Sequence, residues 1–436
     1  MLSRRTLGLA LLVVCFRVRA DSQSIDHIER ERAQIMLQEA ASDVRRYYYD
    51  PKLRGVDLDA KVRDAKEKIA KAESSAELLL QIAAVMETLG DSHTAFVPPH
   101  DPIRPDYGWR FQMVGEHCFV THVRPKSDAD AKGVKPGDEV LTIDGFTPTR
   151  ESLSKMEYVL AVLLPQSKLR VSLRDPSGKI REVDVMAKVR QAKTITNFDD
   201  VTGRDAWRLR LEHENQQRLV RPLYKELNNQ AAILKLSIFS PSDDAWQMIE
   251  KARGHECLVV DLRGNPGGAE PALQDLLGRI FETDVKIADR VMREATNPMM
   301  AKGTQHSFSG KLILLVDSRS ASAAELFARV IQIEKRGIVL GDRTAGSVME
   351  ARYYPHTTGT NPVFTYGTSV AIADLTMQDG KSLEHTGVAP DETILPTAAD
   401  LANGRDPVLA RAAVLAGATL SSEEAGKLFP YEWPMN

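Results

Sequence analysis

Ser322 lies in a segment whose residue types could support nucleophilic chemistry, KLILLVDSRSASAAELFARVIQ, residues 311–332. Residues 311–316 form a short apolar run of strand length, and residues 317–321 are small and polar, as is typical of a turn. From Ala323 onward, composition and apolar spacing predict a helix. Ser322 is therefore expected at a helix N-terminus, where free N–H groups and the helix dipole favour a developing oxyanion.

The same segment also has a simpler interpretation. Ser322 and Glu325 have the spacing of a capping box, in which the serine caps the helix and the glutamate bonds back to the serine N–H. Capping boxes are common, so the segment alone leaves capping and catalysis both open.

A second segment with chemical potential is CLVVDLRGNPGG, residues 257–268. A buried strand is predicted to end at Asp261, and a Gly- and Pro-rich turn precedes a helix. Such turns expose N–H groups at the carboxyl end of a strand, where α/β sheets bind ligands. Gly267 and Gly268 permit a close approach of backbone to ligand. A tight turn without any ligand explains these residues equally well.

The N-terminus is typical of a secretory signal peptide, residues 1–20, with Arg4, Arg5, an apolar run over 7–16 and the small residue Ala20. The two arginines also resemble a twin-arginine export signal. The apolar run is too short for a stable membrane span. We therefore expect a soluble exported protein, in a bacterial periplasm or outside the cell.

Three kinds of sequence pattern follow the signal. Residues 24–100 are rich in Ala, Glu, Lys and Leu at helical spacing and predict a helical N-terminal domain. Residues 105–190 contain short strands and turns and predict a β-rich domain. Residues 195–436 alternate apolar strands with helices, which predicts an α/β core.

Composition and charge exclude several classes of protein. The net charge of -3 gives no argument for nucleic-acid binding. Cys118 and Cys257 lie in apolar strand-like runs, so two buried thiols are expected rather than a disulfide. No His or Cys spacing typical of a metal site is apparent, and we expect neither a metal nor an organic cofactor. Homo-oligomerisation is compatible with the sequence.

The stretch GVKPGDEVLTIDG, residues 133–145, resembles the core motif of PDZ domains. PDZ domains bind an extended peptide C-terminus by adding it as a strand to a sheet edge. The resemblance implies that the carboxylate loop and first edge strand are formed by Tyr107, Gly108, Trp109, Arg110 and Phe111.

Four motifs, DLRGNPGG, SASAAE, GDRTAG and LEHTGVAPD, occur in this order along the chain. Their order resembles that of the C-terminal processing, tail-specific and tricorn-type serine peptidases, over nearly the whole mature chain. The resemblance implies an α/β core of ClpP/crotonase-like type with Ser322 as the nucleophile. It also implies an oxyanion hole formed by the N–H of Ala323 and that of Gly267 or Gly268.

The activating group departs from the commonest pattern of that family. Many members carry a lysine where this chain has Ser347. The tricorn-type branch instead uses a histidine supported by a serine and a glutamate. The resemblance implies His93 as the base, and Ser92, Glu384 or both as the group that orients it.

A neutral imidazole suits this role because its pKa lies near physiological pH. His385 and Lys381 remain as alternative bases, whereas Arg343 cannot be one because a guanidinium does not lose its proton.

The resulting expectation is an exported serine peptidase that cleaves flexible polypeptides with free, apolar C-termini. An inactive scaffold that binds peptides or lipophilic ligands, and an esterase using the same serine, are the alternatives. The absent G-x-S-x-G elbow counts against an α/β-hydrolase.

Overall fold

The structure, a computed structural model, describes residues 25–99, 103–191, 214–241, 244–359 and 363–434. The predicted signal peptide lies outside these ranges. Within them, no helix combines the length and the apolar character needed to span a bilayer.

The N-terminal part consists mainly of helices. It comprises α2 (His27–Tyr47), the 3₁₀ turn η1 (Leu53–Gly55), α3 (Leu58–Lys71) and α4 (Ser75–Glu87). Asp26, Asp57 and Ser74 each accept a hydrogen bond from the first turn of the helix they precede, which explains where the helices begin. The buried faces share one hydrophobic cluster with Val370 and Ala371 of the C-terminal half, so these helices pack against distant sequence.

The region predicted to be PDZ-like forms an antiparallel sheet in the order β3-β4-β5-β6-β7. Its strands are β3 (Trp109–Val114), β4 (His117–Val123), β5 (Glu139–Ile143), β6 (Lys168–Arg174) and β7 (Ile180–Met186). Its helices are α5 (Asp128–Ala131), α6 (Leu153–Tyr158) and the π-helical turn η2 (Val159–Leu163). The strands β2 (Ile103–Asp106) and β8 (Lys188–Gln191) pair where the chain enters and leaves this region.

The core contains a largely parallel sheet in the order β18-β15-β14-β11-β10-β9. The strands are β9 (Leu223–Glu226), β10 (Ala231–Lys235), β11 (Cys257–Asp261), β14 (Lys311–Val316), β15 (Gly337–Gly341) and β18 (Glu392–Thr393). Alternate residues of β11 and β14 face two different hydrophobic clusters, so the sheet is buried on both faces. Cys257 and Cys118 are buried free thiols, as predicted.

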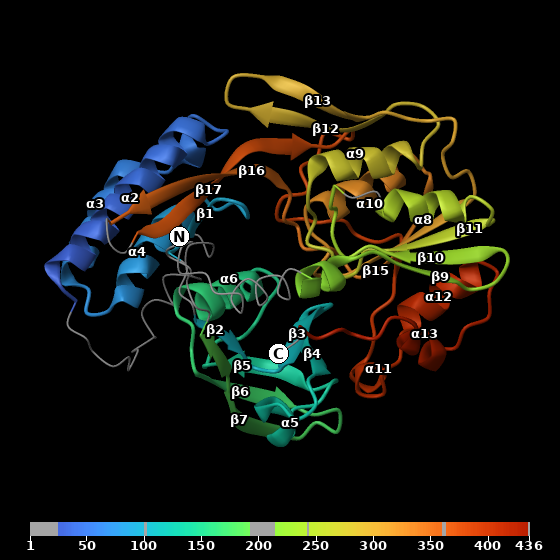
Figure 1. Cartoon of the computed structure of the whole chain (residues 1–436), viewed down its shortest axis with the longest axis horizontal. Helices are drawn as coiled ribbons and strands as arrows, with labels where there is room; N and C mark the ends of the chain where they lie inside the picture. The colour runs from blue at the N-terminus through green and yellow to red at the C-terminus, as the bar shows by residue number, and fades with distance from the viewer. Residues whose placement is uncertain (1–24, 100–102, 192–213, 242–243, 360–362, 435–436) are drawn as a thin grey trace, which may run out of the picture.

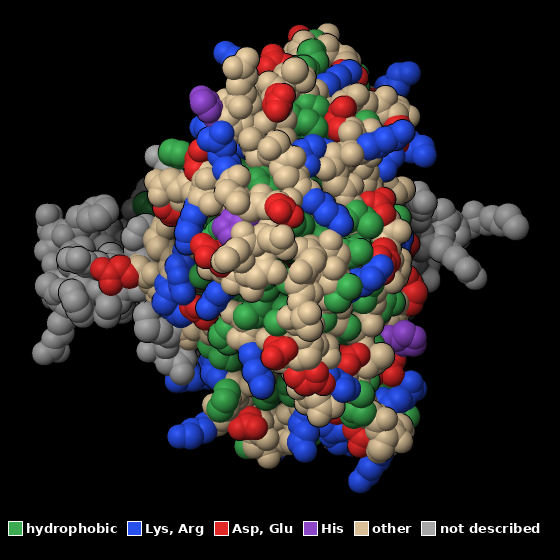
Figure 2. Space-filling model, turned by 90° about the vertical axis from the view of Figure 1, so that its right-hand side faces the viewer, with side chains coloured by type: hydrophobic (Ala, Val, Ile, Leu, Met, Phe, Trp, Pro, Cys, Tyr) green, Lys and Arg blue, Asp and Glu red, His purple; other side chains and the backbone are tan. Residues whose placement is uncertain are grey.

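Helices cover both faces of this sheet (Figure 1). One face carries α9 (Glu270–Gly278), α10 (Ala323–Ile333) and α8 (Asp244–Ala252). The other carries α12 (Pro407–Leu415) and α13 (Ser422–Leu428), with the short α11 (Ala398–Ala402) nearby. On the outer face of the core, Lys and Arg side chains are interspersed with Asp and Glu (Figure 2).

A second sheet joins the core to the N-terminal helices (Figure 1). It contains β1 (Ala95–Val97), β12 (Val285–Met292), β13 (Thr296–Ala301), β16 (Met349–Thr358) and β17 (Phe364–Thr376). β1 pairs antiparallel with β17, with Ala95 opposite Ser369. The Ala371 N–H also donates to Thr94 Oγ1 at 3.1 Å, across 277 positions of sequence. This pairing holds the turn that carries His93 against the core.

Candidate active site

Ser322 lies between β14 and α10 with a backbone conformation that is rare for a residue with a side chain. Its φ is 53° and its ψ is -118°. The strain is held by two hydrogen bonds of the Ser322 N–H, to the Ser347 carbonyl at 2.9 Å and to Glu325 Oε2 at 3.0 Å. A strained backbone conformation persists only where surrounding contacts hold it in place, and such conformations are enriched at functional sites. The Glu325 bond is the glutamate half of the predicted capping box.

The turn after β11 lies directly against Ser322. The Ala321 N–H donates to the Asn265 carbonyl at 2.9 Å, which joins this turn to the residue before the serine. The buried Asn265 side chain accepts from the Gly267 N–H at 2.8 Å and donates to the Leu236 carbonyl at 2.8 Å. A Cβ on Gly267 would lie 2.7 Å from Ser322 Cβ and 3.0 Å from the Ala323 nitrogen. Glycine is required here because the turn approaches the serine so closely.

The two glycines of this turn differ in their free hydrogen-bonding groups. The Gly267 N–H is bonded to Asn265, whereas the Gly268 N–H and the Ala323 N–H have no hydrogen-bond partner among the described residues. Gly268 also bridges Phe239 in parallel fashion. Of the two predicted glycines, Gly268 therefore retains a donor for an oxyanion, beside that of Ala323.

We expect Gly267→Ala to lower kcat by roughly 10²-fold, because a shift of about 1 Å at the reacting atoms costs that much. The added Cβ would press on Ser322 and on the Ala323 nitrogen. Gly264→Ala is the matched control, since Gly264 shares the turn and has a φ of 74°, but its Cβ would meet nothing within 4 Å. Hydrolysis of a fluorogenic peptide by the two variants measures the difference. Equal losses in both would show that backbone strain, not the approach to Ser322, causes the effect.

His93, Ser92 and Glu384 form a continuous hydrogen-bonded chain. His93 Nδ1 lies 2.7 Å from Ser92 Oγ, and Ser92 Oγ donates to Glu384 Oε2 at 2.8 Å. The Ser92 N–H donates to Glu384 Oε1 at 2.7 Å. Ser92 donates its only hydroxyl proton to the Glu384 carboxylate. Ser92 Oγ must therefore accept a hydrogen bond from the Nδ1–H of His93. His93 Nε2 then carries the lone pair that a base needs.

The turn that holds His93 is supported by a buried carboxylate that the sequence did not single out. Asp91 Oδ1 accepts from the N–H groups of His93 at 3.0 Å and Thr94 at 2.6 Å, and Tyr48 donates its hydroxyl to Asp91 Oδ2 at 2.9 Å. Burial lowers the pKa of His93, while the carboxylates of Glu384 and Asp91 oppose that shift. The imidazole is therefore neutral at neutral pH, as a general base must be. An Asp two residues before His93 was the available signal, since Asp side chains bond such turns.

One short segment joins the base chain to the nucleophile. The Val348 N–H donates to Glu384 Oε2 at 2.8 Å, and the preceding Ser347 carbonyl accepts the Ser322 N–H. The hydrogen bonds of the described residues do not include one between His93 and Ser322. Such bonds are often long in a protein without substrate and tighten in the reacting complex.

The alternative bases His385 and Lys381 are both exposed. His385 Nε2 lies 2.8 Å from the Gly90 carbonyl and 3.6 Å from Glu384 Oε1, and its side chain is 49% exposed whereas that of Glu384 is 7% exposed. Arg343 lies 3.4 Å from Glu116 of the β-rich region.

The predicted peptide-binding residues lie in and just before β3, the edge strand of the β-rich sheet. Tyr107 donates its hydroxyl to the Gln166 carbonyl at 2.7 Å, and Gly108 has a φ of 72°. Trp109 is buried against Phe111, with ring centroids 4.7 Å apart. Arg110 instead donates to the Tyr431 hydroxyl at 2.8 Å, near the C-terminal end of the described chain.

The turn before Ser322 makes hydrogen bonds to backbone carbonyls of β3. Ser318 Oγ donates to the Met113 carbonyl at 2.5 Å, and Arg319 Nη2 donates to the Phe111 carbonyl at 2.6 Å. Arg319 also pairs with Glu157 of α6 at 2.6 Å. A peptide adding to β3 at these positions must first displace Ser318 and Arg319.

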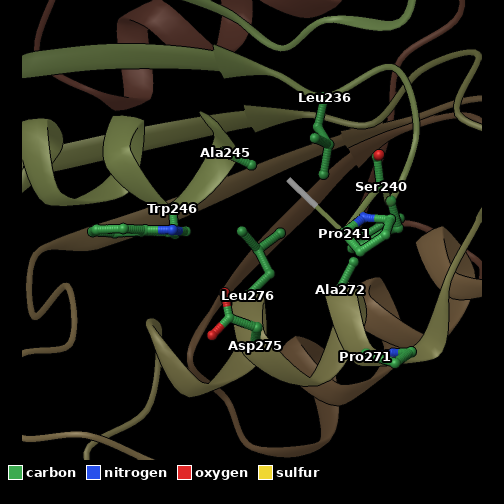
Figure 3. A pocket seen from close by; sticks show the side chains of 10 residues that line it. Leu236, Ser240, Pro241, Ala245, Trp246, Pro271, Ala272, Asp275 and Leu276 are labelled. Carbon is green, nitrogen blue, oxygen red and sulfur yellow. The ribbon is translucent and has the colours of Figure 1, made fainter. Parts of the chain in front are cut away.

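A pocket of about 230 Å³ adjoins the turn after β11 (Figure 3). Leu236 and Leu276 point toward one another across it, and Trp246 lies to one side. Phe239, also in the lining, donates its N–H to the Gly267 carbonyl and accepts from the Ala269 N–H, both at 2.8 Å. An apolar side chain can therefore be accommodated close to the oxyanion turn.

Comparison with known proteins finds a peptidase match in the core. Residues 230–394 match the model of peptidase family S41. A tricorn protease homologue of Streptomyces coelicolor is 26% identical over 405 residues, covering 87% of this chain and 32% of that protein. The tail-specific protease of Haemophilus influenzae is 24% identical, covering 80% of this chain and 52% of that protein. The chain thus spans about a third to a half of the length of these two relatives.

Solved structures share the fold. The photosystem II D1 C-terminal processing protease is 20% identical with a TM-score of 0.51, covering 84% of this chain and 93% of the other. Mature CPAF complexed with lactacystin is 15% identical with a TM-score of 0.61, covering 84% and 95%. The resemblance expected from the order of the four motifs is confirmed. Residues 230–394 of this chain match peptidase family S41, and its relatives include C-terminal processing, tail-specific and tricorn-type proteases.

Proposed function

We propose that this protein is a serine endopeptidase in which Ser322 is the nucleophile and His93 the base. The observation that carries the proposal is the chain His93–Ser92–Glu384, in a protein with Ser347 where many relatives of this type use lysine. The carboxylate and hydroxyl orient the imidazole as the third member of a catalytic triad does.

The reaction is acyl transfer through an ester of Ser322. As Ser322 Oγ attacks the peptide carbonyl carbon, its proton passes to His93 Nε2, and the N–H groups of Gly268 and Ala323 stabilise the oxyanion. The C–N bond then breaks, and the leaving amine takes the proton from His93. Water, deprotonated by His93, attacks the ester and releases the carboxylic acid product and the free serine.

The domain division and the cellular location belong to the same proposal. Residues 24–100 form a helical domain, residues 105–190 a PDZ-like domain, and residues 195–436 a peptidase core of ClpP/crotonase-like type. The protein is exported by residues 1–20. Its substrates are flexible or unfolded polypeptides with free C-termini, which suits an edge strand that can accept an extended chain. The antiparallel sheet with β3 as its edge strand supports the PDZ-like assignment.

If the β3 edge binds apolar peptide C-termini, Arg319→Ala should tighten that binding by about tenfold, the value of one charge-assisted hydrogen bond that the peptide no longer has to displace. Fluorescence anisotropy of a labelled apolar peptide with a free C-terminus measures the affinity. Arg343→Ala is the matched control, because the Arg343 side chain lies 3.4 Å from Glu116, in the exposed turn between β3 and β4. The same peptide as a C-terminal amide should bind weakly to both. Unchanged affinity in Arg319→Ala would contradict strand addition at Phe111.

Labelling with a fluorophosphonate tests the proposed function directly. An activated serine forms a stable phosphonyl ester, so intact mass should rise by one adduct, and peptide mapping should place it on Ser322. Measurable peptide binding without a label would favour an inactive scaffold. Labelling with turnover of esters but not of peptides would favour an esterase.

A further inference from the structure

Glu325, in the first turn of α10, is a fully buried carboxylate that serves more than its own helix. Its side chain is 0% exposed. Oε2 accepts from the N–H groups of Ser322 at 3.0 Å and Ser347 at 2.9 Å. Oε1 accepts from the Gly346 N–H at 2.8 Å and the Thr344 hydroxyl at 2.5 Å. A capping box requires only the first of these four bonds.

The other three bonds come from the segment that joins the nucleophile to the base chain. Gly346 and Ser347 donate to Glu325, and the next residue, Val348, donates to Glu384. Successive N–H groups of this segment therefore bond first to Glu325, beside Ser322, and then to Glu384, which bonds to Ser92.

We propose that Glu325 is a positioning residue that holds Ser322 in register with the His93–Ser92–Glu384 chain by clamping residues 344–347. This inference rests on the proposed function. It goes beyond it by assigning a role to a residue that touches neither the substrate nor the base.

The chemistry of the four donors requires a carboxylate. The Thr344 hydroxyl accepts from the Val388 N–H at 2.6 Å, so its own proton is committed to Glu325. Glutamine offers one oxygen, and its amide N–H₂ would face at least one backbone N–H, whichever way it is turned. Burial raises the pKa of Glu325 to about 7, although the hydrogen bonds from Thr344, Ser347, Gly346 and Ser322 lower it. Assays at about pH 8 therefore keep the group ionised.

The test compares Glu325→Gln with Glu334→Gln at about pH 8. Glu334 lies at the other end of the same helix and is exposed, which makes it a matched control. We expect Glu325→Gln to lower kcat and the rate of fluorophosphonate labelling by about 10²-fold, as a misplaced nucleophile would, with KM changed less than about threefold. A merely structural role would lower the thermal midpoint but would leave kcat per folded molecule unchanged. Wild-type rates in a folded Glu325→Gln protein would overturn the proposal.

A second pair of variants decides the matter if Glu325→Gln does not fold. Thr344→Val removes one donor from the clamp, whereas Thr344→Ser keeps the hydroxyl and loses only a methyl group. Labelling should be about tenfold faster in Thr344→Ser than in Thr344→Val, the value of one hydrogen bond to a charged group. Equal rates would overturn the proposal. If the wild-type protein itself takes no label, the proposed function fails instead, so the two failures are distinguishable.

Discussion

Replacing Ser322 by alanine is expected to abolish peptide hydrolysis, with a loss of roughly 10⁶-fold in kcat, the scale found when a catalytic serine is removed. The hydroxyl is the only group lost. Both hydrogen bonds that hold the strained backbone come from the Ser322 N–H, which alanine retains. The fold should therefore persist, with a thermal midpoint within about 3 °C of the wild-type value.

Turnover of a fluorogenic peptide and fluorophosphonate labelling are the two measurements for Ser322→Ala. Ser177→Ala is a suitable control, because Ser177 lies in the exposed turn between β6 and β7 and bonds only to Asp175 among the described side chains. An unchanged rate in Ser322→Ala would remove this residue from the mechanism. A lost rate with lost folding would instead point to a structural contribution of the hydroxyl.

The second large effect is expected for His93→Ala, with a loss of roughly 10⁴-fold or more, because Ser322 then has no general base. His385→Ala should cost less than about tenfold, since its ring faces the Gly90 carbonyl on an exposed turn. The comparison of kcat/KM between the two variants identifies the base. The reverse order of effects would transfer the role of base to His385.

Glu384→Gln tests the orientation of the imidazole in the same series. Glu384 accepts from the Ser92 hydroxyl, the Ser92 N–H and the Val348 N–H. If the amide N–H₂ takes the place of Oε2, the Ser92 hydroxyl turns to donate to His93 Nδ1, which stabilises the wrong tautomer. An intermediate loss of roughly 10²-fold is expected, because the carboxylate acts through Ser92 rather than directly on the ring.

The strand, turn and helix around Ser322 were readable from the sequence because their signals are local. The predicted strand over 311–316 and the helix from Ala323 coincide with β14 and α10. The buried strand predicted to end at Asp261 is β11. In each case a short apolar run is followed by residues that favour a turn. The local preference for strand and turn therefore matches the buried position of the strand in the fold.

Three strands of the second sheet, β12, β13 and β16, were not predicted, and the composition of β16 explains why. β16, MEARYYPHTT, contains a proline and is largely exposed, so neither apolar alternation nor burial marks it as a strand. It is defined by pairing with β17 over ten residues, beginning with Met349 opposite Asp374. The β12–β13 hairpin likewise depends on its partners.

Glu325 shows how far a local interpretation can reach. The sequence identified it correctly as part of a capping box with Ser322. Its three other donors, from Thr344, Gly346 and Ser347, lie about 20 positions away and have no sequence signal that points to a buried carboxylate. Buried N–H groups need a hydrogen-bond acceptor, and these donors reach Glu325 only because their segment packs against α10.

The nucleophile candidate, its helix and the glycine-rich turn are encoded by adjacent residues, whose conformations follow from local sterics and hydrogen bonding. The activating chain is not encoded in that way. Ser92 and Glu384 are 292 positions apart, and they meet because β1 pairs with β17 and because the Val348 N–H bonds to Glu384. Contacts of such sequence separation arise from sheet pairing and core packing, which no local pattern specifies. The kind of chemistry could therefore be predicted from the residues, and the resemblance named candidate partners for His93, whereas the contacts between these residues are made only by the tertiary structure.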